Sequence, residues 1–134
     1  TVAKELAQKA GLQSRYRTIA GDAFQQEFGE GYDLVLLTNF LHHFSVQTCE
    51  SLLRKIHRSL APGGRVITLE FVPDEDRVTP PPVAEFSLIM LATTPEGDAY
   101  TFREYEQMFA AAGFARTELY PVAGSIEQVL VSTL

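Results

Sequence analysis

The chain has 134 residues, of which 46% are hydrophobic and 21% are charged. These values are ordinary for one globular domain with a hydrophobic core. Its 17 acidic residues outnumber its 11 Lys and Arg, giving a formal net charge of −6. Because phosphate backbones attract basic surfaces, we expect no nucleic acid partner. The longest apolar runs, such as Leu88–Ala92, are far shorter than the roughly 18 residues that span a bilayer, so we expect no membrane partner either.

The single cysteine, Cys49, cannot form an internal disulfide, which fits a reducing cytoplasm. No signal peptide is visible, and position 1 is Thr rather than Met. We therefore expect a cytoplasmic chain that is part of a longer protein.

The first third of the chain predicts one helix and two strands. Apolar residues at helical spacing indicate a helix over Val2–Ala10 that stops at Gly11. A short strand is expected at Tyr16–Ala20. The continuous apolar run in Tyr32–Thr38 is typical of a parallel strand that is buried on both faces.

A βαβ unit is predicted next. Ser45 can cap a helix whose apolar stripe extends to Leu60, and the sequence Pro-Gly-Gly at 62–64 is expected to end that helix. A strand over Arg65–Val72 would follow at once, with a right-handed connection between the two parallel strands.

The last third begins with a charged, proline-rich surface loop at Pro73–Pro82, followed by an apolar helix at Val83–Ala92. Thr101 and Glu104 form a capping box that opens a further helix, which ends near Gly113. Two antiparallel strands, 115–120 and 128–133, close the chain. The class is α/β, with a mostly parallel sheet and a single domain over residues 1–134.

Polar side chains gather where the predicted parallel strands end. Asp22 follows the first strand, His42 and His43 follow the second, and Glu70 lies at the end of the third. Ligands bind beyond the carboxyl ends of strands in open α/β sheets, so this edge is the expected site.

Each of these residues also has a purely structural interpretation. Asp22 can simply shape a turn, and one of the two adjacent histidines is expected to be structural. Glu70 interrupts an apolar strand, which is costly without a partner and favours a functional role. Phe24 and Phe44 are more often core than ligand platforms. No Cys/His cluster has the spacing of a metal site, so no metal is expected.

The sequence resembles the class I methyltransferases, and within them the small-molecule O-methyltransferases of bacteria and plants. The resemblance rests on Gly-Asp-Ala-Phe at 21–24, the segment 32–44, Leu-Ala-Pro-Gly-Gly-Arg-Val at 60–66 and the segment 97–113. It implies a Rossmann-like sheet, S-adenosylmethionine as cofactor and a small-molecule methyl acceptor.

The resemblance also implies residue roles. Asp22, Ala23 and Phe24 would bind the adenine, and Thr38 and Asn39 would lie near the methionine portion of the cofactor. His42 would take the proton from the acceptor hydroxyl, and Glu70 would orient His42. The residues expected to face the methyl acceptor are His43, Phe86 and Met90.

Two departures from the family pattern stand out. A second acid precedes the late helix in the plant-type enzymes, whereas Ala99 and Tyr100 occupy that neighbourhood here, with only Asp98 acidic. The first two strands and the glycine-rich loop of the family are also absent. We therefore expect the apolar edge of the Tyr32–Thr38 strand to pair with another copy in a homodimer, with Tyr16–Ala20, or with a missing half.

Three functions remain open. The first is that the full-length parent is an O-methyltransferase that acts on a small-molecule hydroxyl. Alternatives are a non-catalytic fragment of the same fold that acts only in association, and a methyltransferase with a carbon or nitrogen acceptor, since one fold serves several acceptor types.

Overall fold

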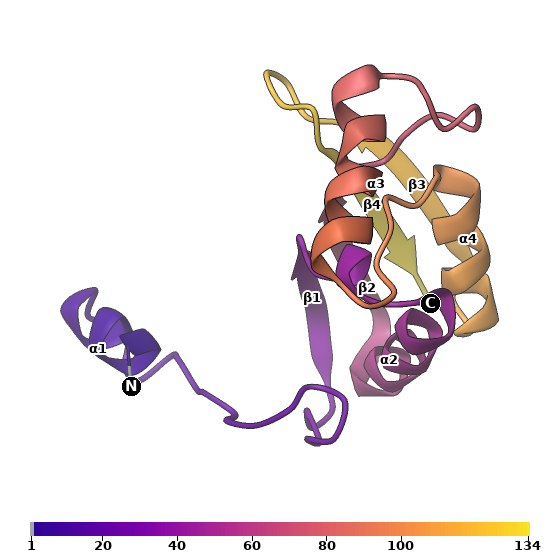
Figure 1. The fold of residues 1–134 in the computed structure, drawn as a ribbon. Coiled ribbons are helices and arrows are strands. Elements are labelled where there is room, and N and C mark those ends of the chain that lie inside the picture. The colour runs from indigo at the N-terminus through magenta and orange to yellow at the C-terminus, as the bar shows by residue number, and fades with distance from the viewer. Residues whose placement is uncertain (1) are drawn as a thin grey trace.

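The computed structural model describes residues 2–134 (Figure 1). Its helices are α1 (Val2–Lys9), α2 (Val46–Ser59), α3 (Pro81–Thr93) and α4 (Phe102–Ala111), with a 3₁₀ turn η1 at Leu41–His43. Its strands are β1 (Tyr32–Thr38), β2 (Leu60–Glu70), β3 (Arg116–Pro121) and β4 (Gln128–Thr133). The α/β class, the β1–α2–β2 unit and the closing antiparallel pair are confirmed.

The four strands of the described residues form one sheet in the order β1-β2-β4-β3. β1 and β2 are parallel, while β4 runs antiparallel to both β2 and β3. The sheet is thus mixed, and the prediction of a mostly parallel sheet is wrong. Only one of its three strand pairs is parallel, because no strand forms before β1.

The strand expected at Tyr16–Ala20 is absent, and this segment is irregular. Tyr16 and Ile19 are 48% and 41% exposed, so the segment has neither a neighbouring strand for its backbone nor a core for its side chains. The prediction that it pairs with the edge of β1 is therefore wrong. Helix α1 stands apart from the sheet at the far end of this extended segment (Figure 1).

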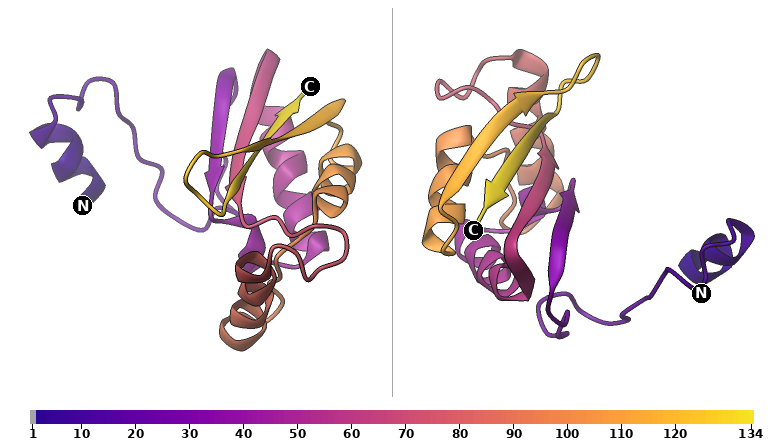
Figure 2. Two further views of the ribbon diagram at one scale, coloured as in Figure 1. Left: turned by 90° about the horizontal axis from the view of Figure 1, so that it is seen from above. Right: turned by 180° about the vertical axis from the view of Figure 1, so that it is seen from behind.

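The hydrophobic core lies between one face of the sheet and helices α2 and α4. Val66 of β2 and Leu130 of β4 are fully buried there. They pack with Leu53 of α2 and with Tyr105 and Phe109 of α4. Figure 2 shows both helices on the same side of the sheet, with no helix of the described chain over the opposite face.

That opposite face is apolar and open. Along β1, Leu34 and Leu36 are 46% and 62% exposed, whereas Val35 and Leu37 point the other way and are partly buried against the core. The alternation follows from the two-residue period of a strand. A strand with two apolar faces is therefore covered on only one of them, and its outer edge is unpaired among residues 2–134.

The predicted boundaries around α2 need two corrections. The helix ends at Ser59, before Pro62, because β2 already begins at Leu60. The Pro-Gly-Gly sequence instead forms an irregularity in the β1–β2 ladder, where a Cβ on Gly64 would lie 2.8 Å from the carbonyl oxygens of Ala61 and Tyr32. Ser45 occupies the N-cap position, but its hydroxyl pairs with that of Thr48 rather than with a backbone N–H.

Other local predictions hold. Thr101 and Glu104 form the capping box of α4, with both reciprocal hydrogen bonds present. Helix α3 begins at Pro81, two residues earlier than expected, with proline in its first turn. Gly29 and Gly31 form a Gly-x-Gly sequence, but it leads into β1 rather than following a strand, so it is not the family's glycine-rich loop.

None of the helices of the described residues is long and apolar enough to cross a membrane.

Candidate active site

A buried carboxylate and imidazole meet at the carboxyl ends of β1 and β2. Glu70 ends β2 and is fully buried, and His42 lies in the 3₁₀ turn after β1 with 3% of its surface exposed. Nδ1 of His42 lies 2.5 Å from Oε2 of Glu70. The predicted pair therefore forms, although 28 residues separate its members.

The other oxygen of Glu70 is also bonded. Its Oε1 accepts the backbone N–H of Phe40 at 3.0 Å and that of Leu41 at 2.8 Å. These N–H groups open the 3₁₀ turn that carries His42, so the same carboxylate holds the turn and the ring. This explains why an acid at the end of an apolar strand is tolerated, because a buried charge needs hydrogen-bond donors around it.

The carboxylate fixes the tautomer of His42. A carboxylate only accepts hydrogen bonds, so Nδ1 must carry the proton and Nε2 is left as the acceptor nitrogen. Two fully buried side-chain atoms in residues 2–134 have no hydrogen-bond partner, Thr68 Oγ1 and Tyr105 OH. Nε2 of His42 also has no partner, but it is not among the fully buried atoms. It therefore keeps contact with solvent and can reach a bound molecule.

A continuous row of rings passes through His42. On one side its ring lies 4.3 Å from that of His43, which adjoins Phe44, and Phe44 meets Phe24 at 4.9 Å. On the other side, the ring of His42 faces that of Phe86 edge-on at 4.8 Å. Phe86 in turn stacks on Phe71 at 4.0 Å. The row joins the loop that contains Asp22 to helix α3.

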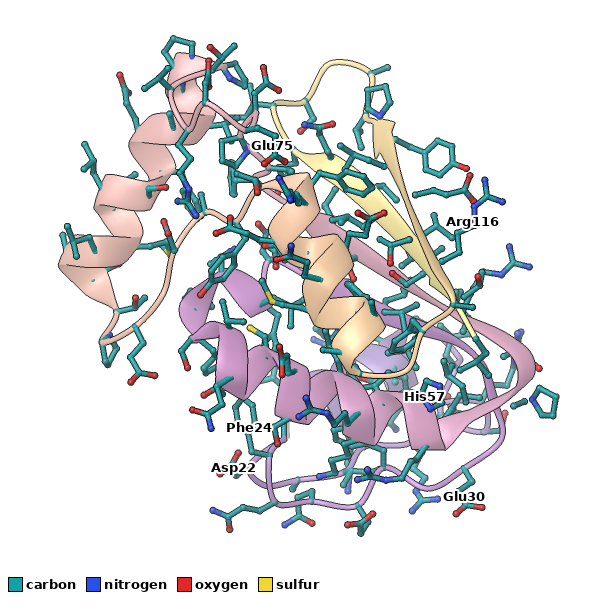
Figure 3. The ribbon with its side chains drawn as sticks, turned by 90° about the vertical axis from the view of Figure 1, so that its right-hand side faces the viewer. Asp22, Phe24, Glu30, His57, Glu75 and Arg116 are labelled. Atoms are coloured by element: carbon teal, nitrogen blue, oxygen red, sulfur yellow. The ribbon has the colours of Figure 1, made fainter. Side chains whose placement is uncertain are left out.

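The expected adenine-binding residues lie on the loop beside α2 (Figure 3). Oδ1 of Asp22 accepts the backbone N–H of Phe24 at 2.9 Å, so the structural interpretation of Asp22 as a turn residue holds. Its Oδ2 makes no hydrogen bond within the described residues and remains free to accept one. Ala23 lines a cavity, and its carbonyl oxygen accepts a hydrogen bond from Lys55 at 3.1 Å.

Thr38, the last residue of β1, and Asn39, which follows it, are expected near the methionine portion of the cofactor, and both are exposed. Thr38 lines the same cavity as Ala23. Asn39 adopts the left-handed conformation with φ of 51°, and its Nδ2 donates to Oε1 of Glu127 at 2.7 Å. Asp22 and Asn39 fit the cofactor's polar atoms, since Asp22 offers a free carboxylate oxygen and Asn39 a free amide oxygen.

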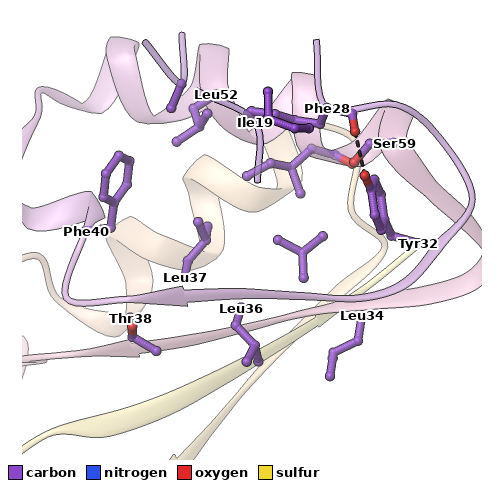
Figure 4. Close-up of a pocket in the computed structure, with 13 residues that line it drawn as sticks. Ile19, Phe28, Tyr32, Leu34, Leu36, Leu37, Thr38, Phe40, Leu52 and Ser59 are labelled. Carbon is purple, nitrogen blue, oxygen red and sulfur yellow. Dashed lines mark hydrogen bonds between the residues drawn. The ribbon is translucent and has the colours of Figure 1, made fainter. Parts of the chain in front are cut away.

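The cavity itself, of about 560 Å³, runs along β1 and is almost wholly apolar. Figure 4 shows Leu37 and Leu52 on one side of β1 and Leu34 and Leu36 on the other. The cavity therefore wraps around the unpaired edge of β1. His42 and Glu70 do not line it. The cavity lacks the convergent polar groups that a reaction needs.

On the acceptor side, His43 is exposed, Phe86 is partly buried and Met90 is 5% exposed. Phe86 and Met90 lie one turn apart on the same face of α3, as their spacing requires. Of the three, Met90 is the one that the structure packs into the interior.

Among the described residues, no acid other than Glu70 bonds to the ring of His42. Asp98 pairs with Arg77 at 3.0 Å, and its backbone N–H donates to the carbonyl oxygen of His42 at 3.0 Å. Ala99 is fully buried, and the hydroxyl of Tyr100 donates to the carbonyl oxygen of Phe44 at 2.7 Å. The site is thus a pair rather than the trio of the plant-type enzymes.

Sequence reasoning missed Glu127, which contacts the candidate site residue Asn39. Glu127 lies 88 residues from its partner Asn39, and no local pattern signals such a contact. Tyr105 of α4 is fully buried in the hydrophobic core. Burial, followed by the nearby charge of Glu70, raises the pKa of its phenol well above the usual range.

The thiol of Cys49 is unreactive at neutral pH. Burial, with the charge of Glu70 as a second cause, raises the pKa of its thiol to about 12, so it stays protonated at neutral pH. Within residues 2–134, no group of three or more His, Cys, Asp or Glu side chains is arranged to hold a metal ion.

Comparison with known proteins identifies the family of this α/β chain. The family model described as "O-methyltransferase domain" matches residues 1–115, so the chain belongs to this family. Two similar solved structures hold the cofactor or its product: PigF with SAH (TM-score 0.85, 30% identity) and human N-acetylserotonin methyltransferase with SAM (TM-score 0.78, 28% identity).

Individual relatives give the same result. A candidate O-methyltransferase of Nostoc punctiforme PCC 73102 superposes on 99% of this chain with a TM-score of 0.94 and 58% identity, and the match spans 41% of that protein. Acetylserotonin O-methyltransferase of Gallus gallus is 35% identical over 74% of this chain and 28% of its own length. The chain thus spans less than half of the relatives that it matches.

One relative differs in its acceptor atom. L-tyrosine C(3)-methyltransferase of Streptomyces lavendulae is 33% identical over 83% of this chain and 30% of its own length. The relatives that match this chain therefore differ in their acceptor atom.

Proposed function

We propose that this chain supplies the base and part of the cofactor site of an enzyme that methylates a hydroxyl group of a small molecule. The observation that carries the proposal is the His42–Glu70 pair, whose geometry leaves one imidazole nitrogen, Nε2, open and able to accept a proton. S-adenosylmethionine would supply an electrophilic methyl group on a sulfonium. Asp22, Ala23 and Phe24 are proposed to hold its adenine, and Thr38 and Asn39 its methionine portion.

The proposed chemistry of the chain is general base catalysis. A hydroxyl is a weak nucleophile at neutral pH, so a base that removes its proton during methyl transfer contributes typically 10²–10⁴-fold. Nε2 of His42 would accept that proton. The ring would then become an imidazolium, which the carboxylate of Glu70 stabilises through Nδ1. Positioning of the two reactants accounts for the rest of the rate.

The acceptor is proposed to contact His43, Phe86 and Met90. The stacked rings of Phe86 and Phe71 beside His42 favour a flat, aromatic acceptor that bears the hydroxyl, since aromatic faces and edges pack well against one another. A carbon acceptor is the second candidate, because a relative with that activity matches most of the chain.

A chimera provides the test. In it, residues 1–134 replace the matching segment of the Nostoc protein, of which that segment is 41%. S-adenosylhomocysteine is titrated into the chimera and into the 134-residue chain in a calorimeter. We expect the chimera to bind and Asp22→Ala to weaken its binding by about tenfold, the loss of one charged hydrogen bond.

Two results would separate the alternatives. If Asp22→Ala leaves the binding of S-adenosylhomocysteine to the chimera unchanged, this chain does not form the adenine site. A chimera that binds cofactor but transfers no methyl group to any hydroxylated or carbon acceptor would favour the non-catalytic fragment. Methylation of a ring carbon that survives His42→Ala would favour the carbon acceptor.

The remaining expectations concern assembly and location. We propose that the protein is a homodimer in the cytoplasm. The open apolar face at Leu34 and Leu36 and the exposed Leu88, Ile89 and Leu91 of α3 support burial by further protein. A free, buried Cys49 fits a reducing compartment. Sedimentation equilibrium of the chimera tests the dimer, which a monomer at micromolar concentration would contradict.

A further inference from the structure

We propose that Glu127, in the turn between β3 and β4, is a positioning residue that orients the side chain of Asn39 towards the cofactor. The proposal rests on the proposed function, because it takes Asn39 to face the methionine portion of S-adenosylmethionine. It starts from one contact, in which Nδ2 of Asn39 donates to Oε1 of Glu127 at 2.7 Å. This hydrogen bond joins the carboxyl end of β1 to a hairpin far along the chain.

The backbone of Asn39 is already fixed. Its φ of 51° lies in the left-handed region, which Asn tolerates better than most other residues with a side chain. Its backbone N–H donates to the carbonyl oxygen of Leu69 at 2.9 Å, which continues the β1–β2 ladder by one bond. With the main chain held in this way, only the side-chain torsions of Asn39 remain free, and the bond to Glu127 fixes them.

Glu127 is itself held in place. Its backbone N–H donates to Oγ of Ser125 at 3.1 Å, which orders the turn. The next residue, Gln128, pairs with Glu70 in the β2–β4 ladder and donates from its side chain to the carbonyl oxygen of Val72 at 3.0 Å. The turn is therefore attached to the same strand that carries the catalytic carboxylate.

The chemistry of the carboxylate decides which end of the Asn39 amide is left over. A carboxylate cannot donate, so the NH₂ group of Asn39 must face Glu127 and the oxygen Oδ1 must face away. Oδ1 makes no hydrogen bond within residues 2–134 and can accept one from the ammonium group of the methionine portion. The reversed amide would direct N–H groups at that cation and repel it.

The experiment uses the chimera with Glu127→Ala, Glu127→Gln and Asn39→Ala, and with Glu118→Ala as the control. Glu118 is an acid on the same hairpin that pairs with Arg116, so its removal changes the charge equally without touching Asn39. Three quantities are measured: the dissociation constant of S-adenosylhomocysteine, the KM and kcat of methyl transfer, and the NMR position of the Asn39 side-chain amide without cofactor.

We expect Glu127→Ala to weaken cofactor binding about tenfold and to raise KM for S-adenosylmethionine by a similar factor. The kcat should stay within about twofold of that of the unmodified chimera. Glu127→Gln should restore binding to within about threefold, because its amide oxygen still accepts from Nδ2. Since both variants act through one contact, Glu127→Ala with Asn39→Ala should weaken binding no more than Asn39→Ala alone. The Asn39 amide signal should move in Glu127→Ala and stay in Glu118→Ala.

Unchanged binding in Glu127→Ala, additive losses in the double variant, or an Asn39 amide signal that does not move would each overturn the proposal. The two proposals fail differently. If the unmodified chimera does not bind S-adenosylhomocysteine, the proposed function fails and the role of Glu127 falls with it. If binding depends on Asp22 but not on Glu127, only the inference about Glu127 is wrong.

Discussion

Glu70 bonds to the ring of His42 and to the backbone of the turn that carries that ring. Its Oε2 lies 2.5 Å from Nδ1 of His42, while its Oε1 accepts two backbone N–H groups of residues 40 and 41. One carboxylate thus sets both the position and the tautomer of the proposed base.

Glu70→Gln separates these two roles. The amide oxygen of Gln can still accept from the backbone of the turn, so its NH₂ group must face His42. Nδ1 then becomes the acceptor and the proton moves to Nε2, which can no longer take one from the acceptor hydroxyl. We expect kcat of the chimera to fall by roughly 10²–10⁴-fold. Binding of S-adenosylhomocysteine should be unchanged, and a drop in kcat of less than tenfold would contradict the tautomer argument.

Tyr105→Phe should not destabilise the protein. The hydroxyl of Tyr105 is buried without a partner, and removing an unsatisfied group is neutral or stabilising by about 1 kcal/mol. Tyr100→Phe is the control, because the hydroxyl of Tyr100 donates to Phe44 and its loss should cost about 1 kcal/mol. Urea unfolding of the chimera measures both. A clear loss of stability in Tyr105→Phe would reveal a hydrogen-bond partner for its hydroxyl.

Stability should decline in alkaline solution because of Cys49. Its thiol ionises near pH 9 in the unfolded chain but has a pKa of about 12 when folded, so the folded state keeps a proton that the unfolded state releases. This contribution is complete below pH 9 and is lost as pH rises from 9 to 12. The raised pKa of Tyr105 acts in the same direction above pH 10.

The urea midpoint of the chimera, compared between pH 8 and pH 10.5, tests this effect. We expect the decline to be smaller in Cys49→Ala than in the unmodified protein. Equal declines in the two proteins would show that the buried thiol does not contribute.

Gly64→Ala should destabilise the β1–β2 pair by roughly 1–3 kcal/mol, because the added methyl group meets backbone oxygens that cannot move aside independently. Gly63→Asn is the matched control. Gly63 has φ of 78° with nothing near a Cβ, and Asn tolerates this conformation. Of the two substitutions, only Gly64→Ala should lower the midpoint of thermal unfolding of the chimera. Equal midpoints for both variants would contradict the close approach.

The sequence predicted those parts of the fold that local patterns control. The helices α2 and α4 follow from apolar stripes, and the capping box at Thr101 was visible as two residues at fixed spacing. The meeting of His42 and Glu70 was predictable because both follow parallel strands, whose carboxyl ends share one edge.

Other features depend on contacts that no local pattern encodes. Tyr16–Ala20 has the composition of a strand, but a strand needs a neighbour for its backbone, and none is present among the described residues. Ser45 stands where a cap is expected, yet its hydroxyl finds Thr48. The contact between Asn39 and Glu127 depends on where the closing hairpin lies, which the sheet order decides.

The most direct measurement compares the chimera with its His42→Ala variant in transfer of a labelled methyl group from S-adenosylmethionine to a panel of hydroxylated aromatic compounds. The account predicts that His42→Ala lowers kcat by at least about 10²-fold while S-adenosylhomocysteine binds as before. A His42→Ala variant that methylates a hydroxyl at the unmodified rate would contradict the assignment of His42 as the base.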